Sequence, residues 1–597
     1  MIEIILATWS GKMDSSLEPQ QSGRMKIWKR KSFKIVMAIA AMTLILFCVL
    51  GYHRPLLTFG PFTYIDDGKS VAIVSCSARV VGDLEVPVSI YNKPVTCICP
   101  QAFRSCSRMT SITIPDSVTS IGQSAFNFCT GLTSITIPSS VTRIGDNAFC
   151  GCAGLISVTV PASVTSIGEF AFRNCTGLTG ITIPGKVTVI NNGMFRDCIS
   201  LARITIPDSV SRIGNDAFEG SGLTSITIPG KVYRIGGNAF GKCTSLTSII
   251  IPSSVTSIGN YAFEGSGLTE ITIPNGIKSI SDSAFRSCNS LTRVSIPTSV
   301  TCIEDFAFCD CAALTSVNIP AGVKSIGRNT FKFCAGMKAI TVDSKNAYYS
   351  SLDGVLFNKE QTAIVAGPGG ISGNITIPDC VKSIGENAFA HCKDLTGVII
   401  PNVVTSIGKE AFYGCSSLAS ISIPYSVTSI GMGAFANCHS LMVITVDPHN
   451  AKHSSLEGLL YDKSQTAILQ CPGGKSGCIT IPGGVTSICE GAFCGCTGLT
   501  SIKIPSGVTS IKTAAFQGCT GLASITIPAS VTGIWSAAFA HCTSLTSAHF
   551  SGNAPKMGVN VFRHTASDFT VYYLDGKIGF TSPEWNGYKA VNEGASK

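Results

Sequence analysis

A Phe-x-x-Cys motif that returns every 23 residues constrains this chain more than any other feature of its sequence. The phenylalanine of the motif recurs from Phe103 to Phe562, with two steps of 22 residues and two of 58, and the cysteine follows it in most repeats. A fixed period of about 20 to 30 residues with apolar side chains at set offsets is typical of a solenoid, in which each repeat forms one coil and contacts only its neighbours. The core ladder that this pattern predicts includes Phe126, Cys129, Phe149, Cys152, Phe172, Cys175, Phe240 and Cys243.

One repeat, residues 132–154, predicts two short strands and a turn. Ile135 and Ile137 alternate with serine and threonine, which is the period-two pattern of a half-buried strand, and Pro138 ends that strand. Residues 141–144 form a second extended stretch, and residues 146–152 have room for a single α-helical or 3₁₀ turn. We therefore expect a mainly β fold whose coils bury their apolar side chains only when they are stacked.

The ladder cysteines are expected to be reduced. Equivalent side chains in stacked coils point the same way at the strand spacing of about 4.8 Å, whereas a disulfide needs converging Cβ atoms about 3.8 Å apart. Cys243 has serine, Ser221 or Ser266, at the equivalent position of each neighbouring coil. Buried thiols therefore fit better than disulfides. C-x-C pairs such as Cys150 and Cys152 make poor zinc sites, because they lie on opposite sides of a turn.

The N-terminal sequence is typical of a targeting region. Residues 25–52 place a basic flank before an uncharged apolar run at residues 35–52. Eighteen helical residues span about 27 Å, close to the hydrocarbon core of a bilayer, so we expect an N-terminal transmembrane helix that acts as a signal anchor, with a cleaved signal peptide as the alternative. Residues 1–24 are expected to be a disordered leader or the product of a mis-called start codon, because Met25 would be a more natural start. Residues 53–597 would then be extracytoplasmic, at the cell surface or in the periplasm, and secreted if the segment is cleaved.

The remaining chain divides into a repeat region and two caps. Residues 53–100 and 551–597 depart from the repeat and are expected to cover the ends of the stack, because open terminal coils expose apolar surface and unpaired strand edges. The repeats fill residues 101–550, interrupted by two islands at about 343–374 and 447–478 that align with each other without a gap.

The first island contains the candidate partner contacts, Tyr348 and Tyr349. Inserts in a solenoid map to one face, and exposed aromatic side chains are good interface anchors. The alternative is that both tyrosines only pack within the island, which would then be a longer coil that continues the core.

The repeat consensus resembles a known family. Leu-x-x-Ile-x-Ile-Pro-x-x-Val-x-x-Ile-Gly-x-x-Ala-Phe-x-x-Cys, over about residues 100–550, is similar to the BspA-like, or Treponema pallidum type, leucine-rich repeat. The resemblance implies a right-handed leucine-rich-repeat solenoid. It also implies a surface or secreted protein whose partner is a protein, such as an extracellular matrix or host-cell protein, because several members of the family are adhesins. The motif residues are core residues, so they do not indicate which residues bind.

No sequence pattern indicates catalysis, a cofactor or nucleic-acid binding. No Gly-x-Gly-x-x-Gly follows a strand, no Walker sequence is present, and no Gly-x-Ser-x-Gly elbow stands in context. The net charge of +9 is not concentrated in the repeats. We expect an exported binding protein and no enzyme, with a structural cell-envelope spacer and a glycan-binding module as alternatives. The oligomeric state is left open.

Overall fold

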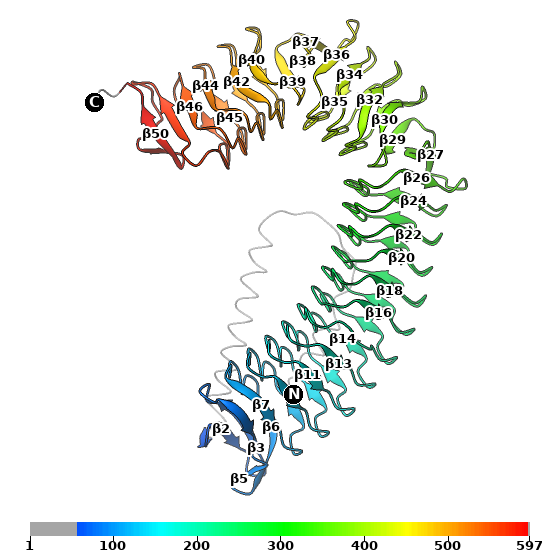
Figure 1. Cartoon of the computed structure of the whole chain (residues 1–597), viewed down its shortest axis with the longest axis vertical. Helices are drawn as coiled ribbons and strands as arrows, with labels where there is room; N and C mark the ends of the chain where they lie inside the picture. Colours follow the sequence, from blue (N-terminus) through cyan, green and yellow to red (C-terminus); the bar gives the residue numbers. More distant parts are fainter. Residues whose placement is uncertain (1–55, 595–597) are drawn as a thin grey trace, which may run out of the picture.

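The computed structural model describes residues 56–594, which form a continuous solenoid that bends into an open arc (Figure 1). Each regular coil contributes one strand to a long-strand face and one to a short-strand face. All neighbouring repeat strands are parallel and one coil apart; Ile112, Ile135 and Val158 pair on the first face, and Ile121, Ile144 and Ile167 on the second.

The long-strand face consists of β7 (Met109–Thr113), β9 (Ser134–Thr136), β11 (Ser157–Thr159), β13 (Gly180–Thr182), β16 (Ser225–Thr227), β18 (Ser248–Ile250), β20 (Glu270–Thr272), β22 (Arg293–Ser295), β24 (Ser316–Ile319), β26 (Ala339–Val342), β30 (Gly373–Thr376), β32 (Leu395–Ile399), β34 (Ser420–Ile423), β36 (Val443–Val446), β40 (Gly477–Thr480), β42 (Leu499–Lys503), β44 (Ser524–Ile527) and β46 (Ser547–Phe550). The short-strand face consists of β8 (Ser120–Ile121), β10 (Arg143–Ile144), β12 (Ser166–Ile167), β14 (Val189–Ile190), β15 (Arg212–Ile213), β17 (Arg234–Ile235), β19 (Ser257–Ile258), β21 (Ser279–Ile280), β23 (Cys302–Ile303), β25 (Ser325–Ile326), β31 (Ser383–Ile384), β33 (Ser406–Ile407), β35 (Ser429–Ile430), β41 (Ser487–Ile488), β43 (Ser510–Ile511), β45 (Gly533–Ile534) and β47 (Lys556–Met557).

The third side of each coil contains the Phe-x-x-Cys motif, and we call it the turn face. The prediction of an α-helical or 3₁₀ turn there is wrong, because residues 56–594 contain no helix. In one such turn, the N–H groups of Asn147, Phe149 and Gly151 donate to carbonyl oxygens of the next coil at 2.7–2.8 Å. Asn147 and Gly151 have positive φ angles of 54° and 76°. A helix directs its N–H groups back into its own segment, whereas this alternating backbone shares them with the neighbouring coil.

The predicted transmembrane helix at residues 35–52 lies outside the described residues. Across residues 56–594 the structure has no helix with the length and apolar character that a membrane crossing requires. The expected fold class is therefore corrected for the described chain to a mainly β solenoid without helices.

Stacked phenylalanine rings form the axis of the core. From Phe103 to Phe331, the ring centroids of neighbouring coils are 5.1–6.1 Å apart and their planes lie within 13° of parallel. The ladder cysteines lie beside them; Cys152 Sγ donates to the carbonyl oxygen of Phe126 at 3.0 Å. Every cysteine that the structure describes is unpaired. The eight core-ladder residues Phe126, Cys129, Phe149, Cys152, Phe172, Cys175, Phe240 and Cys243 are fully buried.

The phenylalanine stack is interrupted at the two islands, which divide the core into three segments. The stacks run from Phe103 to Phe331, from Phe389 to Phe435 and from Phe493 to Phe562, and each belongs to its own cluster of buried side chains. We name the boundary between the coils of Phe331 and Phe389 joint 1, and the boundary between the coils of Phe435 and Phe493 joint 2.

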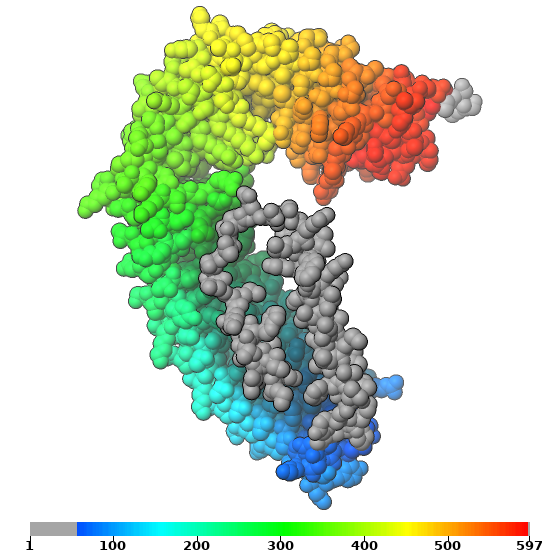
Figure 2. All heavy atoms as spheres, turned by 180° about the vertical axis from the view of Figure 1, so that it is seen from behind, coloured from blue at the N-terminus to red at the C-terminus, as the bar shows by residue number. Residues whose placement is uncertain are grey.

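Each island is an antiparallel sheet that returns the chain to the short-strand face. In the first, β27 (Tyr349–Leu352) pairs with β28 (Val355–Asn358), which pairs with β29 (Ala363–Ala366), and β29 joins β31 in parallel. The second island repeats this with β37 (His453–Leu456), β38 (Leu459–Asp462) and β39 (Ala467–Gln470). The first island projects from the convex edge of the arc near β27 (Figures 1 and 2). A Pro-Gly-Gly segment follows each island where a regular coil has its Phe-x-x-Cys turn, and this missing turn produces the joint.

Both ends of the described solenoid are covered. At the first end, β1 (Leu57–Phe59), β2 (Phe62–Asp66) and β3 (Val71–Cys76) form an antiparallel sheet, and β3 joins β6 (Lys93–Ile98) in parallel; β5 (Ser89–Ile90) pairs with β6, and β4 (Gly82–Glu85) pairs with β7. At the other end, β48 (Thr570–Tyr573), β50 (Tyr588–Asn592) and β49 (Glu584–Trp585) extend the long-strand face. Phe580 and Trp585 pack over Phe550 there and shield the last coil.

Candidate protein-interaction surface

The three faces of the solenoid differ in how much their exposed side chains vary. On the long-strand face, threonine recurs at the same exposed position, in Thr136, Thr159, Thr182, Thr227 and Thr272. On the turn face, the residue after the core phenylalanine changes from coil to coil and includes Arg173, Arg196, Glu219, Lys332 and Tyr413. Packing of the core dictates which residues stand at the inward positions. Residues that recognise a partner are therefore expected at exposed positions that vary from coil to coil.

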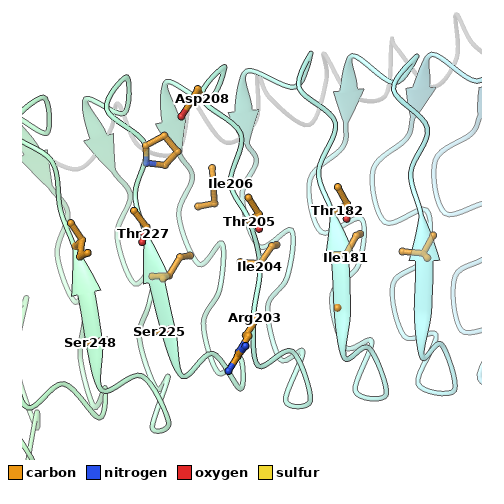
Figure 3. A pocket seen from close by; sticks show the side chains of 15 residues that line it. Ile181, Thr182, Arg203, Ile204, Thr205, Ile206, Asp208, Ser225, Thr227 and Ser248 are labelled. Carbon is orange, nitrogen blue, oxygen red and sulfur yellow. The ribbon is translucent and has the colours of Figure 1, made fainter.

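The long-strand face has an open groove of about 890 Å³ between β13 and β18 (Figure 3). Strand pairing weakens there to an isolated bridge between Thr182 and Thr205. The groove is lined by threonine hydroxyls, serines and isoleucine side chains, and Arg203 and Asp208 are its charged residues. This arrangement can supply hydrogen bonds and apolar contact, but it assembles no nucleophile with a base.

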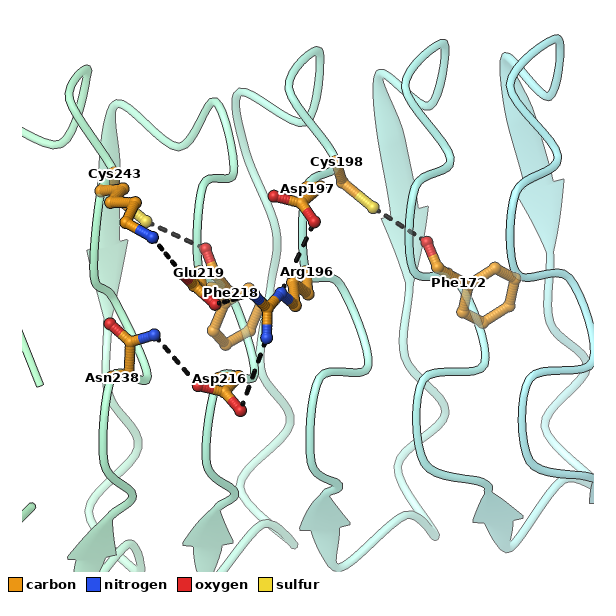
Figure 4. A network of polar contacts seen from close by, with 10 residues as sticks. Phe172, Arg196, Asp197, Cys198, Asp216, Phe218, Glu219, Asn238 and Cys243 are labelled. Atoms are coloured by element: carbon orange, nitrogen blue, oxygen red, sulfur yellow. Dashed lines mark hydrogen bonds and ion pairs between the residues drawn. The ribbon is translucent and has the colours of Figure 1, made fainter. Parts of the chain in front are cut away.

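An ion-pair network around the buried carboxylate of Glu219 lies on the turn face where a coil is one residue short (Figure 4). The carboxylate of Glu219, which is 2% exposed, lies 2.7 Å from Lys242 Nζ and 2.9 Å from Arg196 Nη2. Burial alone would raise the pKa of Glu219, but the hydrogen bond from Lys242 and the charge of Arg196 outweigh it and lower the pKa. The network therefore stabilises a charged group inside the stack and leaves Lys242 largely exposed.

Joint 1 has an aromatic and charged cluster at its rim, the rim cluster: Lys332, Phe333, His391, Glu410 and Tyr413. The rings of Phe333 and His391 are 4.0 Å apart across the joint. Lys332 Nζ lies 5.5 Å and 5.7 Å from the ring centroids of Phe333 and Tyr413 and forms an ion pair with Glu410 at 3.2 Å. Phe333 remains 41% exposed. An exposed aromatic ring held by charged neighbours is the chemistry of an interface anchor.

His391 is held neutral within this cluster. Burial, with the nearby charges of Lys332 and Lys393, lowers its pKa to about 4. Its Nε2 atom is buried without a hydrogen-bond partner. Sequence reasoning did not single out His391 and did not find the rim cluster. The signal for the cluster in the sequence is that the large side chains of Phe333 and Tyr413, with Lys332, stand one or two positions after the core phenylalanine, where most repeats have small or polar residues.

The two predicted contact tyrosines have different environments in the first island. Tyr348 is 49% exposed, whereas Tyr349 is half-buried and its hydroxyl oxygen accepts a hydrogen bond from the N–H of Ile326 at 3.1 Å. Asn346 fixes both: its Oδ1 accepts from the N–H groups of Tyr348 and Tyr349, each at 2.8 Å. The structure therefore leaves Tyr348 available for contact and places Tyr349 at the edge of joint 1.

Comparison with known proteins identifies the family. The pattern described as BspA type leucine rich repeat region (6 copies) matches residues 96–224, 211–338, 372–458 and 475–576, more than half of the chain. The chain therefore belongs to the BspA type leucine-rich repeat family, and the resemblance seen in the sequence is confirmed. Leucine-rich repeat proteins generally bind proteins and are typically not enzymes.

Solved structures include similar solenoids. A leucine rich cell surface protein from Faecalibacterium prausnitzii A2-165 is 27% identical, with 84% of this chain and 96% of that chain covered at a TM-score of 0.30. A leucine-rich repeat protein from Bacteroides ovatus ATCC 8483 is 23% identical, with 90% and 99% covered at a TM-score of 0.29. The comparison with curated proteins gave no match.

Proposed function

We propose that this chain acts outside the cytoplasm as an adhesive protein that binds a protein partner, such as an extracellular matrix or host-cell protein, through the turn face near joint 1. The observation that carries the proposal is the rim cluster, where Phe333 is exposed and held between charged and aromatic side chains. Tyr348 on the first island adds a second exposed aromatic ring. Membership of a family whose solenoids present wide surfaces supports the same function.

The chain provides a matched control for this proposal. The second island and joint 2 repeat the fold with Lys452 in place of Tyr348 and Asn437 in place of Phe333. If the aromatic residues anchor a partner, Tyr348→Ser and Phe333→Ser should each weaken binding, whereas Lys452→Ser and Asn437→Ser should not.

The test is binding of the chain to immobilised fibronectin, fibrinogen and collagen by surface plasmon resonance. We expect saturable binding to at least one of them and about a tenfold loss for Phe333→Ser, because truncation of an aromatic anchor costs about 1–2 kcal/mol or more. No binding to any matrix protein would favour the spacer interpretation, for which the recurring threonines of the long-strand face are the supporting observation. Binding to a glycan array alone would favour a glycan-binding module.

A further inference from the structure

Joint 1 contains a cleft that joint 2 nearly lacks. The cleft of joint 1 has a volume of about 290 Å³, and the equivalent space at joint 2 has about 120 Å³. Equivalent residues line both: Ile326, Phe331 and Val365 at joint 1 correspond to Ile430, Phe435 and Leu469 at joint 2. The difference must therefore come from the side chains that the two joints do not share.

The walls of the joint 1 cleft carry unpaired backbone groups of opposite kinds. No hydrogen-bond acceptor within residues 56–594 meets the N–H groups of Asn329 and Phe331 on one wall or that of Phe333 at the rim, although in a regular coil the equivalent groups donate to the next turn. On the other wall, the carbonyl oxygens of Glu386 and Ala390 likewise receive no donor from the described chain. Asn329 Oδ1 is also buried without a partner. Unpaired backbone groups inside a protein are costly, so the cleft is complementary to a polar occupant.

At joint 2 the equivalent N–H groups of Gly433 and Phe435 also have no acceptor within residues 56–594, but side chains of the chain itself fill more of the space. Gln470 donates from Nε2 to the carbonyl oxygens of Cys471 and Ala492 at 3.2 and 3.3 Å, and Asn437 N–H reaches the carbonyl oxygen of Cys494 directly at 3.5 Å. Joint 1 has Ala366 and Gly367 where joint 2 has Gln470 and Cys471. Gly367 N–H donates to the carbonyl oxygen of Ala388 at 2.6 Å, as Cys471 N–H does to that of Ala492 at joint 2, but Ala366 has no side-chain donor that could add the bonds of Gln470.

The rim cluster holds the walls of joint 1 apart. Phe333 and His391 face each other across this joint, and the equivalent residues of joint 2 are Asn437 and Gly495. Gly495 allows close approach, since a Cβ atom there would overlap Asn437 Oδ1. The phenylalanine ring and the imidazole are too large to let the two walls of joint 1 approach as closely. The hydrogen bonds from Lys332 Nζ to Asn387 and Glu410 fix the separation of the walls.

We propose that the joint 1 cleft binds the main chain of a short peptide segment with small side chains, which adopts the alternating backbone of the regular turns and supplies the missing turn of the ladder. Peptide carbonyl oxygens accept from the Asn329, Phe331 and Phe333 wall, and peptide N–H groups donate to Glu386 and Ala390. A main chain with alternating positive and negative φ angles turns its carbonyl oxygens to one edge and its N–H groups to the other, and glycine adopts the positive φ readily. The cleft volume of about 290 Å³ admits a few glycine- or alanine-sized residues. The inference rests on the proposed function and names the part of the partner that enters the solenoid.

The test uses the full chain and the probe fluorescein-(Gly-Ala)₃-amide in fluorescence anisotropy titrations. Two independent double variants copy joint 2 into joint 1: A366Q/G367C fills the cleft, and F333N/H391G removes the pair that holds it open. We expect saturable binding to the native chain and at least a tenfold loss in both variants. The control Q470A/C471G at joint 2 should retain the native affinity, and circular dichroism verifies that each variant is folded.

Other outcomes would overturn the inference. An N-methylated (Gly-Ala)₃ probe lacks N–H donors, so equal affinity for it would exclude hydrogen bonds from the peptide to Glu386 and Ala390. If neither probe binds, water rather than a peptide fills the cleft. Self-association in sedimentation velocity that A366Q/G367C abolishes would make a second copy the occupant. Matrix binding tests the proposed function separately. If the native chain does not bind the probe, and A366Q/G367C binds matrix as tightly as the native chain does, the cleft inference alone is refuted.

Discussion

At the residue scale, the repeat assigns each side chain a role through its distance from the core phenylalanine. Cysteine at the third position after it is small enough for the packed interior and donates its thiol hydrogen to a carbonyl oxygen of the preceding coil, as Cys175 does to Phe149 at 3.1 Å. Serine replaces it at Ser221 and Ser266, next to Cys243 and Cys288, and each pair is within 3.4 Å. The position thus requires a small hydrogen-bonding group rather than a disulfide.

Thiol reactivity should therefore separate the cysteines into two groups. Burial raises the pKa of Cys243 and of Cys288 to about 11, so both remain protonated and unreactive at pH 8. Cys380 and Cys478 are exposed and should react first. Iodoacetamide labelling followed by peptide mass spectrometry should show rapid modification of Cys380 and Cys478, with ladder cysteines labelled only after denaturation. Fast labelling of Cys243 in the native chain would contradict the buried ladder.

His391 should make stability depend on pH. Its pKa is lowered from 6.5 to about 4 on folding, so the unfolded state binds a proton more readily. The contribution of neutral His391 is complete above about pH 6.5 and is lost as the pH falls towards 4. In urea unfolding at pH 7 and pH 5, the native chain should lose more stability than His391→Asn, whose side chain tolerates the left-handed backbone at this position. Equal losses in both chains would contradict this assignment.

At the element scale, the islands are regular sheets whose loops are pinned by one asparagine each. Asn450 is fully buried; its Nδ2 donates to the carbonyl oxygens of Pro424 and Val427, each at 2.9 Å, and its Oδ1 accepts from Lys452 and His453. Asn346 repeats these contacts in the first island. The aligned copies predicted a shared insert from sequence, but nothing in the period of the repeat indicated that each insert removes a turn and opens a joint.

Removal of this asparagine should destabilise the second island. Asn450→Ala leaves buried donors and acceptors unpaired, and we expect a loss of about 2–4 kcal/mol in unfolding free energy. Chemical denaturation measures the loss, and hydrogen exchange should show faster exchange in residues 450–456. His449→Ala is the control, because the His449 side chain is 87% exposed. An equal effect of both substitutions would argue against the pinning contacts.

At the scale of the whole molecule, the joints divide one solenoid into three packed core segments. Stability in a repeat array is a sum of coil terms and interface terms between neighbours, so the weakest interfaces decide where cooperativity ends. The phenylalanine stack is interrupted at both joints, and we expect the segments on either side to unfold in separate transitions.

Tryptophan fluorescence can test this expectation. Within residues 56–594, Trp535 and Trp585 both belong to the third segment. Phe516→Ala in that segment should lower the urea midpoint seen by fluorescence, because deletion of a buried phenylalanine costs about 3–5 kcal/mol. Phe149→Ala in the first segment should lower the midpoint seen by circular dichroism and leave the fluorescence midpoint unchanged. A shift of both signals by both substitutions would show one cooperative unit.

The sequence by itself determined the period, the inward residues and hence the stacked architecture, because each coil can bury its apolar side chains only against identical neighbours. Tyr348 could be proposed as an exposed aromatic from its place in an island. The turn was mispredicted as helical because the sharing of the Asn147 and Phe149 N–H groups with the next coil is a property of the stack. Likewise, only the tertiary structure brought Phe333 and His391 together across joint 1, since their contact depends on the space left by a missing turn between coils that are distant in sequence.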